Sequence, residues 1–403
     1  MRLARARPFF GWWVAWTGFL MALFAWGLGF YGPGVYLAWL TRRHGWPLAE
    51  VSAGITLYYI ASAAIVFVSG DLYGRMGHRR AVLTGVAALG SGALAMPLAG
   101  AGWQVGAAFL VMALGWALLG SAGVNIVIAP WFERRRGMVV SLALNGASLG
   151  GVLITPMIVL LAESYGETAA VAIAVALMLA TLGVFAALTL GHRPAELGLA
   201  PDGDAPAAAA PVATGATGRR TLLASWRFWS LALPFALALH AQVAVLTHQF
   251  RFLGDFMPAT RAAMVIALAG VLAVAGRVAT GFVVDRLDRR AVAAANFTLQ
   301  GGALVLLALA DTPVMLWAGC LLFGLGVGNQ VTLSGLIVQV EFTRTDFARV
   351  VGLVVAIAQV AYAFGPGVLG WLAGRVGYGP GMAAEAGLLL LAAAIVLAGR
   401  PRP

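Results

Sequence analysis

The sequence predicts an all-α membrane protein whose twelve transmembrane helices form two pseudo-symmetric six-helix bundles. Of its 403 residues, 61% are hydrophobic and only 10% are charged, whereas charged residues make up roughly 25% of an ordinary soluble protein. Apolar runs of about 20 residues, long enough to cross a hydrocarbon layer roughly 30 Å thick, follow one another along the chain. This composition excludes a soluble enzyme, a nucleic-acid-binding module and, because Cys320 is the single cysteine, a disulfide framework.

Turn and charge signals divide the apolar runs into twelve predicted spans. The apolar stretch behind the basic N-terminus has no small-residue cleavage site, so we interpret it as an uncleaved first span. The predicted spans are residues 9–40, 50–74, 81–101, 103–132, 137–162, 168–190, 226–253, 261–285, 291–310, 313–341, 347–374 and 380–399.

A composition change in the middle of the chain separates two halves of six spans each. Residues 191–225 are rich in Pro, Gly and Ala and show no apolar period, which is typical of a linker. We therefore expect an N-terminal bundle at 1–190, a cytoplasmic linker at 191–225 and a C-terminal bundle at 226–403.

The arginines predict the orientation, because cytoplasmic loops carry an excess of basic residues. All 26 basic residues are arginines, and the chain has no lysine. With both termini in the cytoplasm, twenty arginines fall in cytoplasmic segments and five in external ones, which leaves Arg277 inside the eighth span. We expect a multi-pass protein of the cytoplasmic (inner) membrane.

A charged motif follows the second span at Gly70 to Arg80 and recurs about 210 residues later, at Gly281 to Arg290. Equal topology in both halves implies a parallel repeat about an axis along the membrane normal. Both copies resemble the loop signature Gly-x-x-x-Asp-Arg-x-Gly-Arg-Arg of the major facilitator superfamily. The first copy departs from it, because Gly74 occupies the acidic position.

The resemblance implies that these loop charges latch the cytoplasmic side in the outward-open state. The alternative is that the arginines only follow the positive-inside rule. The candidate gating residues are Asp71, Arg75, Arg79, Asp285, Arg286 and Arg289.

Further motifs are similar to the monocarboxylate porter and oxalate:formate antiporter branch of this superfamily, including its bacterial members. The similarity covers spans 1 to 5, 7 and 8 well and the last four loosely. It is carried by Gly11-Trp-Trp, Trp39 to Trp46, Glu50-Val-Ser, Pro130-Trp-Phe-Glu-Arg-Arg-Arg-Gly137, Asn145-Gly-Ala-Ser-Leu-Gly-Gly151, Pro156, and His248 followed by Gly276-Arg277-x-x-x-Gly281-x-x-x-Asp285-Arg286.

Arg277 is the leading candidate for binding a substrate. An arginine inside a span costs about 2.5 to 3.5 kcal/mol on insertion scales, so a position facing a cavity is the default interpretation. Its planar guanidinium can hold one carboxylate through two parallel hydrogen bonds, and the resemblance places the substrate-binding arginine of the family here. A structural pair with Asp285 or with a polar group of another span is the alternative.

Two departures from the family pattern bear on the charge of the substrate and on the coupling to H⁺. Ala273 stands one turn before Arg277, where animal monocarboxylate porters place a proton-carrying Asp. The second cation of the oxalate carriers falls near Ala358 or Gln359. One buried cation favours a monoanion over a dianion.

His240 and His248 are the imidazoles of the predicted membrane interior, and both lie on the seventh span. His is the side chain whose ordinary pKa lies nearest physiological pH, so both are proton-coupling candidates. His248 matches the bacterial family pattern and is also a candidate for lining the cavity. A satisfied packing role is the alternative for each.

Amides and phenols within the spans must find polar partners. In the family, spans 1, 4, 5, 7, 8, 10 and 11 line the cavity, so four of these side chains are further substrate-binding candidates, with helix-to-helix hydrogen bonding as the alternative. They are Tyr31, Asn125, Gln359 and Tyr362.

One catalytic pattern occurs and is rejected. Gly146-Ala-Ser-Leu-Gly150 matches the Gly-x-Ser-x-Gly nucleophile elbow, but that motif needs a strand-to-helix turn and a nearby His and Asp. Close packing of small residues explains it better. No His, Cys or carboxylate cluster has metal-ligand spacing, and no cofactor is expected.

The resulting prediction is a secondary active transporter, not an enzyme, that moves a small organic monocarboxylate by alternating access, coupled to H⁺. Its predicted partners are that organic anion, H⁺ and the lipid bilayer, with no nucleic acid and no obligatory protein partner. Export of an amphipathic drug or metabolite is the alternative within transport. An intramembrane hydrolase based on Ser148 and a non-transporting receptor of this fold are the alternatives outside it.

Overall fold

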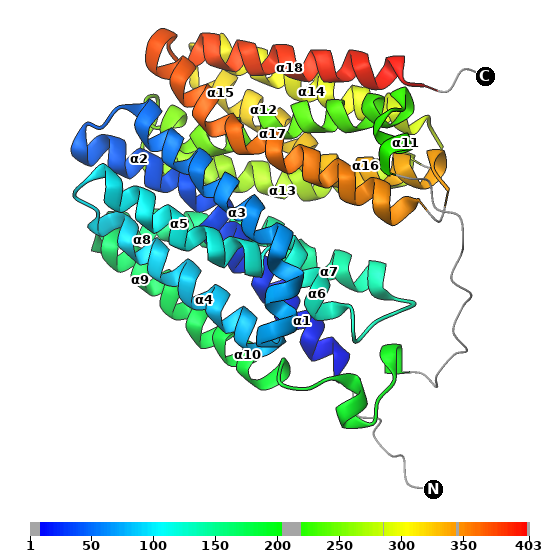
Figure 1. The fold of residues 1–403 in the computed structure, drawn as a ribbon. Helices are drawn as coiled ribbons and strands as arrows, with labels where there is room; N and C mark the ends of the chain where they lie inside the picture. Colours follow the sequence, from blue (N-terminus) through cyan, green and yellow to red (C-terminus); the bar gives the residue numbers. More distant parts are fainter. Residues whose placement is uncertain (1–8, 204–218, 285, 344–345, 401–403) are drawn as a thin grey trace, which may run out of the picture. The chain divides into compact units, whose positions relative to one another are not determined.

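The computed structural model describes residues 9–203, 219–284, 286–343 and 346–400. Within these ranges the chain is helical without a strand, and twelve helical segments are long and apolar enough to cross a membrane (Figure 1). The all-α class and the twelve spans predicted from hydropathy are confirmed, and the span limits differ from the predicted ones by a few residues.

The first six spans are mostly composed of more than one helical piece. Three of them contain a π-helical segment, and the segment η1 overlaps the glycine-rich run of span 1. The elements in chain order are α1 Gly11–Phe24, η1 Ala25–Tyr31, α2 Gly32–His44, α3 Leu48–Met76, α4 His78–Ala95, η2 Met96–Leu98, α5 Gly102–Leu119, α6 Ser121–Ile128, α7 Arg136–Leu149, η3 Gly150–Ile154, α8 Thr155–Tyr165, α9 Glu167–Met178, η4 Leu179–Gly183 and α10 Val184–Thr189.

The second six spans contain longer uninterrupted helices, and span 10 is broken at Gly328. The short helical turns between the two groups of spans are η5 Pro194–Leu197, η6 Pro201–Gly203 and α11 Arg219–Leu223. The helices of the second six spans are α12 Trp226–Leu253, α13 Ala259–Val284, α14 Arg289–Ala308, α15 Pro313–Val327, α16 Asn329–Glu341, α17 Phe347–Val376 and α18 Tyr378–Ala398.

Contacts group the chain into two compact units whose limits differ from the two sequence halves. The first unit contains residues 1–32, 61–98 and 107–210, and the second contains 33–60, 99–106 and 211–403. The second unit therefore includes α2 and the first part of α3 together with all helices from α11 onward. Division of the chain at the 191–225 linker stays a prediction.

Glycines allow close helix packing in the first unit, where α1 packs against α7. A methyl group on Gly146 would meet the backbone oxygen of Phe19, and one on Gly150 would meet that of Leu23. Helix backbones approach this closely only where the residue has no side chain. The Gly-x-Ser-x-Gly pattern is therefore a packing motif, as predicted.

In the second unit, α12 packs against α17 and α18, and α14 packs against α15 and α18. Figure 1 shows α14 and α18 running side by side. Gly365 brings α17 close to α12, because a methyl group there would lie 2.6 Å from the carbonyl oxygen of His240. The adjacent Pro366 has no backbone N–H, so α17 lacks one helical hydrogen bond at this contact.

Candidate functional site

Arg277 lies in α13 about two turns before the helix ends. The preceding residue, Gly276, faces α15 so closely that a methyl group on it would meet the carbonyl oxygen of Leu325. This approach brings Arg277 to the break between α15 and α16. Its Nε donates a hydrogen bond to the carbonyl oxygen of Gly328 at 2.9 Å, so the half-buried guanidinium is held at a helix break inside the membrane span.

Buried amides surround this break on the side of α14. Asn329 donates to the side chain of Asn296 at 3.0 Å, and Asn296 donates to the carbonyl oxygen of Gly326. Gln330 donates at 3.3 Å both to Gln300 and to the carbonyl oxygen of Ala238 in α12. The amides therefore act as hydrogen-bonding links between α14, α15, α16 and α12.

His248 is fully buried and makes contacts through both ring nitrogens. Nε2 lies 2.9 Å from the carbonyl oxygen of Pro366, which can only accept, so Nε2 carries the hydrogen. Nδ1 then accepts from the hydroxyl of Tyr378 at 3.0 Å, and the hydroxyl of Ser52 lies 3.3 Å from Nε2. These contacts give the neutral imidazole a complete set of protein partners in this conformation.

His240, two turns earlier on α12, has a different environment. Its Nδ1 lies 2.9 Å from the carbonyl oxygen of Ala361 in α17, and its Nε2 lies 3.7 Å from Oε1 of Glu385 in α18. The Glu385 side chain is 1% exposed. A buried acid and a half-buried base therefore face each other inside the membrane span.

The other candidate binding residues fall in both units. In the second unit Tyr362 is half-buried and packs edge-on against Tyr59, with ring centroids 5.4 Å apart, and Gln359 is half-buried one turn earlier on α17. In the first unit Tyr31 ends η1, and Asn125 donates to the carbonyl oxygen of Ser121 within α6. His240 contacts the residue next to Tyr362, whereas Arg277 and His248 bind separate partners.

The candidate gating residues lie at the helix ends predicted to be cytoplasmic. Asp285 lies outside the described residues, and Arg286 is exposed. Arg289 donates to the carbonyl oxygen of Leu336 at 2.5 Å. In the first unit Asp71, Arg75 and Arg79 are exposed, and Arg79 lines a cavity of about 230 Å³ with five other polar side chains, namely His78, Arg80, His192, Arg193 and Glu196.

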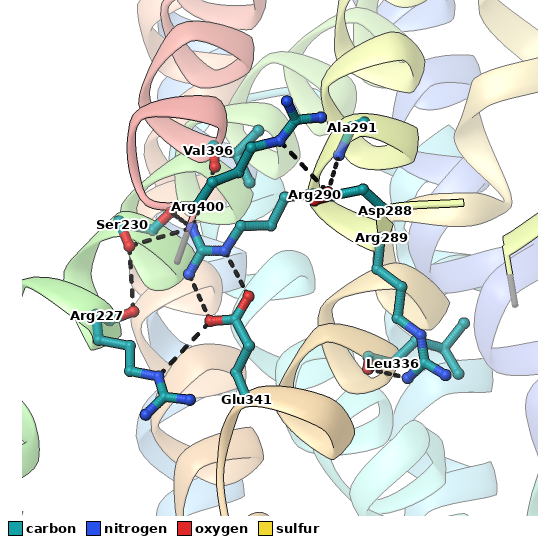
Figure 2. Close-up of polar contacts among 10 residues, drawn as sticks. All are labelled: Arg227, Ser230, Asp288, Arg289, Arg290, Ala291, Leu336, Glu341, Val396 and Arg400. Atoms are coloured by element: carbon teal, nitrogen blue, oxygen red, sulfur yellow. Dashed lines mark hydrogen bonds and ion pairs between the residues drawn. The ribbon is translucent and has the colours of Figure 1, made fainter. Parts of the chain in front are cut away.

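A buried ion pair at these ends involves Arg290, a residue of the sequence motif that is outside the six predicted gating residues. Its side chain is 2% exposed and binds Glu341 through Nε to Oε1 at 2.6 Å and Nη2 to Oε2 at 2.8 Å. Nη1 donates in addition to Ser230 and to the carbonyl oxygen of Val396, each at 3.1 Å. Figure 2 draws these contacts around the Arg290 guanidinium. Arg290 thus joins α14 to α12, α16 and α18.

A second residue missed by sequence reasoning is Asp202, which lies in the segment predicted as linker. It accepts hydrogen bonds from the backbone N–H groups of Glu133, Arg134 and Arg135, at 2.8 to 3.2 Å, immediately before α7. Burial alone would raise the pKa of Asp202, but these N–H groups and the Arg134 guanidinium hold the pKa below its ordinary value. The carboxylate therefore fastens residues 201–203 to the loop between α6 and α7.

The sequence around both residues hints at a role without identifying their partners. Arg290 is the second arginine of the Arg-Arg pair in the repeated motif, but its ion-pair partner Glu341 can be identified only in the folded chain. Asp202 stands in a Pro-Asp-Gly-Asp sequence that reads as a turn. Among the residues that the structure describes, no group of three or more His, Cys, Asp or Glu side chains could hold a metal ion.

Comparisons with known proteins agree with this architecture. The sequence model described as Major Facilitator Superfamily matches residues 15–343 and 257–403. Among curated protein sequences, no relative matches. Solved structures match across nearly the whole chain at low sequence identity.

Two of these structures show how far the likeness extends. A variant of the nucleoside transporter NupG is 14% identical, with a TM-score of 0.74, covering 97% of this chain and 100% of its own. A bacterial homologue of the human lysosomal transporter Spinster, in an inward-facing and occupied conformation, is 14% identical, with a TM-score of 0.73, covering 99% of this chain and 100% of its own. At such identity the likeness establishes the fold.

The family match spans most of the chain and the twelve-helix fold agrees with it, so a transporter of small molecules is supported over an enzyme. The chain belongs to the major facilitator superfamily.

Proposed function

We propose that this chain moves a small organic monocarboxylate across the cytoplasmic membrane by alternating access, coupled to H⁺, with both termini in the cytoplasm. The observation that carries the proposal is the position of Arg277 in the interior of α13, at the helix break of span 10. An arginine is costly inside a span, and cavity-facing positions are where such residues occur.

The guanidinium geometry favours a carboxylate as the ligand. The bond from Nε to Gly328 fixes the plane of the group, and a planar guanidinium can donate two parallel hydrogen bonds to one carboxylate. A single anchor of this kind suits a monoanion. We propose Arg277 as the anchor, with His248, Tyr31, Asn125, Gln359 and Tyr362 as further binding residues and the loop charges as the cytoplasmic latch.

Uptake by proteoliposomes tests the anchor, with labelled formate, acetate and lactate as probes. Arg277→Gln should reduce uptake by about tenfold or more, because a bidentate charged hydrogen bond is lost. Arg277→Lys should leave a partial activity, because a point charge remains without the fork. Arg261→Gln, an exposed arginine at the start of the same helix, is the matched control and should transport normally. Full uptake by Arg277→Gln would refute the assignment.

Export of an amphipathic drug or metabolite is the second candidate, favoured by the irregular helices of spans 5 and 11. Span 5 contains the π-helical segment Gly150–Ile154, and α17 contains Pro366. A pH-gradient assay with cationic dyes alongside the acids separates the two, and uridine belongs in the same panel because a fold relative transports nucleosides. Transport of the dyes without the acids would favour the exporter.

A further inference from the structure

Glu385 is a carboxyl group placed inside the membrane span with little to compensate it. Its side chain is 1% exposed, and Oε2 has no hydrogen-bond partner among the described residues. Oε1 faces Nε2 of His240 at 3.7 Å. A buried carboxylate without donors is unfavourable, so this group either pairs with a cation or takes up a proton.

His240 is oriented by its other nitrogen. The carbonyl oxygen of Ala361 can only accept, so Nδ1 carries a hydrogen and donates to it at 2.9 Å. Nε2 therefore faces Glu385 either as a lone pair or, in the imidazolium, as an N–H donor. The side chain of His240 is 13% exposed, against 1% for Glu385, so the imidazole is the member of the pair that protons reach first.

The two groups together bind protons in steps that belong to the pair. With one proton beyond the Nδ1 hydrogen, the pair is neutral overall, whether that proton resides on the imidazole or on the carboxyl. Loss of that proton leaves a net negative charge in the span, and gain of another leaves a net positive one. The Oε1 to Nε2 separation is longer than a hydrogen bond, so a small helix movement would change how strongly the pair holds the proton.

The contact that orients His240 also links it to the Gly365-Pro366 segment of α17. Ala361 lies in α17 just before Gly365 and Pro366, where α17 approaches the backbone of His240. A shift of α17 against α12 would lengthen or break the Nδ1 bond. The proton affinity of the pair would then depend on the conformation of the transporter, which is the requirement for coupling.

We propose that His240 and Glu385 form a proton-binding site between α12 and α18 that carries the coupling H⁺ of this transporter. Proton binding by the pair stands on the geometry alone, whereas its role in coupling rests on the proposed function.

Other titratable or charged groups of the helices packed around the pair have different partners or lie at helix ends. On α12 these are Arg227, near Glu341, His248, bound to Pro366 and Tyr378, and Arg251, bound to Asp255. On the remaining helices, Arg277 donates to Gly328, Arg289 donates to Leu336 and Arg290 pairs with Glu341. The ring of Tyr362 packs against Tyr59, the Arg375 guanidinium lies over the Trp371 ring, and the Tyr378 hydroxyl contacts His248. Arg261 is exposed at the start of α13.

Infrared difference spectroscopy of the full chain in lipid tests proton binding without a substrate. The pH-dependent C=O stretch of a protonated buried carboxyl should be present in the unmodified protein and absent from Glu385→Gln. In His240→Gln the band should persist to higher pH by about one unit or more, because a nearby cation that favours the carboxylate is gone. Glu50→Gln removes an exposed carboxyl and should leave the band unchanged.

Two results would overturn the proposal: a titrating band that survives Glu385→Gln, or one whose pH dependence is the same in His240→Gln. If Glu385→Gln does not fold, the His240→Gln spectrum decides by itself. His192→Gln removes an exposed imidazole and serves as the imidazole control; its band should titrate as in the unmodified protein.

Coupling is measured in proteoliposomes with lactate as the probe. In Glu385→Gln, accumulation driven by a pH gradient should fall by about tenfold or more, while lactate exchange at equal pH continues. Unchanged gradient-driven accumulation would remove the coupling role. If the unmodified protein transports none of the acids, the proposed function fails, and the infrared result still decides whether the pair binds protons.

Discussion

Arg290 and Glu341 form a bidentate ion pair, Nε to Oε1 at 2.6 Å and Nη2 to Oε2 at 2.8 Å, at the helix ends predicted to be cytoplasmic. Three further acceptors take the Nη1 hydrogens of Arg290 (Figure 2). The guanidinium is therefore both charge-paired and hydrogen-bonded, which is the condition under which a buried arginine is tolerated. The pair connects α14 and α16, and the Nη1 bonds add α12 and α18.

Breaking this pair should destabilise the protein strongly. Arg290→Gln removes the bidentate partner of the Glu341 carboxylate and leaves it only the exposed guanidinium of Arg227, 3.9 Å away. We therefore expect the free energy of unfolding to fall by about 3 kcal/mol, the lower end of the cost of breaking a buried pair. Thermal unfolding in detergent micelles measures the change. Adding Glu341→Gln to Arg290→Gln should recover part of the loss, because the orphaned charge is removed.

Arg400→Gln is the matched control at the same end of the unit. Its ion pair with Asp288 is 3.5 Å long, and both side chains are about half exposed. Exposed pairs contribute about 0 to 1 kcal/mol, so this variant should melt near the unmodified protein. Equal destabilisation by Arg290→Gln and Arg400→Gln would contradict the assigned role of burial.

Gly276 should tolerate no side chain. Gly276→Ala places a methyl group against the carbonyl oxygen of Leu325, and overpacking of this kind costs about 1 to 3 kcal/mol. Gly281→Ala, one turn later on the same helix, meets no atom within 4 Å and should be neutral or slightly stabilising, because alanine favours helix. Comparison of the two melting temperatures isolates the packing effect.

Since Gly276 sets the approach of α13 to α15, Gly276→Ala should also displace Arg277 from Gly328. We expect uptake of the acid probes to fall with this variant and to remain in Gly281→Ala. Normal uptake and stability in Gly276→Ala would show that the close approach is dispensable.

His248 should contribute to stability through its two ring nitrogens. His248→Phe keeps most of the volume but leaves the Pro366 carbonyl and the Tyr378 hydroxyl without their partner, at about 1 to 3 kcal/mol for a buried unsatisfied group. Tyr378→Phe removes one of these bonds and should cost less. A His248→Phe protein as stable as the unmodified one would argue against this structural role and in favour of a transport role.

Asp202 should make stability depend on pH in the acid range. Its pKa is lower in the folded chain than its ordinary value of 3.8, so the unfolded chain binds the proton more readily. The contribution of the carboxylate is therefore complete above that ordinary value and is lost as the pH falls through the lower folded value. Unfolding measured against pH should show this loss.

Asp202→Asn is the variant for this test, because asparagine tolerates the positive φ of 63° at this position. The variant should be less stable than the unmodified chain at neutral pH, and the two melting temperatures should converge at low pH. A constant difference between the two across the whole range would contradict the role of the Asp202 charge.

Features that depend on local composition can be predicted from the sequence. The twelve spans follow from runs such as 168–190 and 226–253, because each helix must satisfy its own backbone and present apolar side chains to lipid. The packing function of Gly146 and Gly150 followed from the same logic. Arg277 stands out in the sequence because it is a charged residue inside an otherwise apolar span.

The residues that pair across helices cannot be predicted from the sequence. Glu385 and Glu341 each lie on a helix far along the chain from the residue they face, and nothing within either span indicates that residue. Asp202 reads as part of a linker, although the structure fastens it to the loop before α7. Such pairs depend on how each helix is rotated about its axis and packed against its neighbours, which hydropathy does not encode.

The membrane environment, the twelve helices and the arginine inside α13 follow from the amino-acid sequence alone, because burial in hydrocarbon constrains every residue of a span independently. Which groups face one another depends on the folded arrangement: Arg277 faces Gly328, His248 faces Pro366, His240 faces Glu385 and Arg290 faces Glu341. These contacts bring together residues distant in sequence, and they exist only after glycines and prolines have set the distances between the helix backbones.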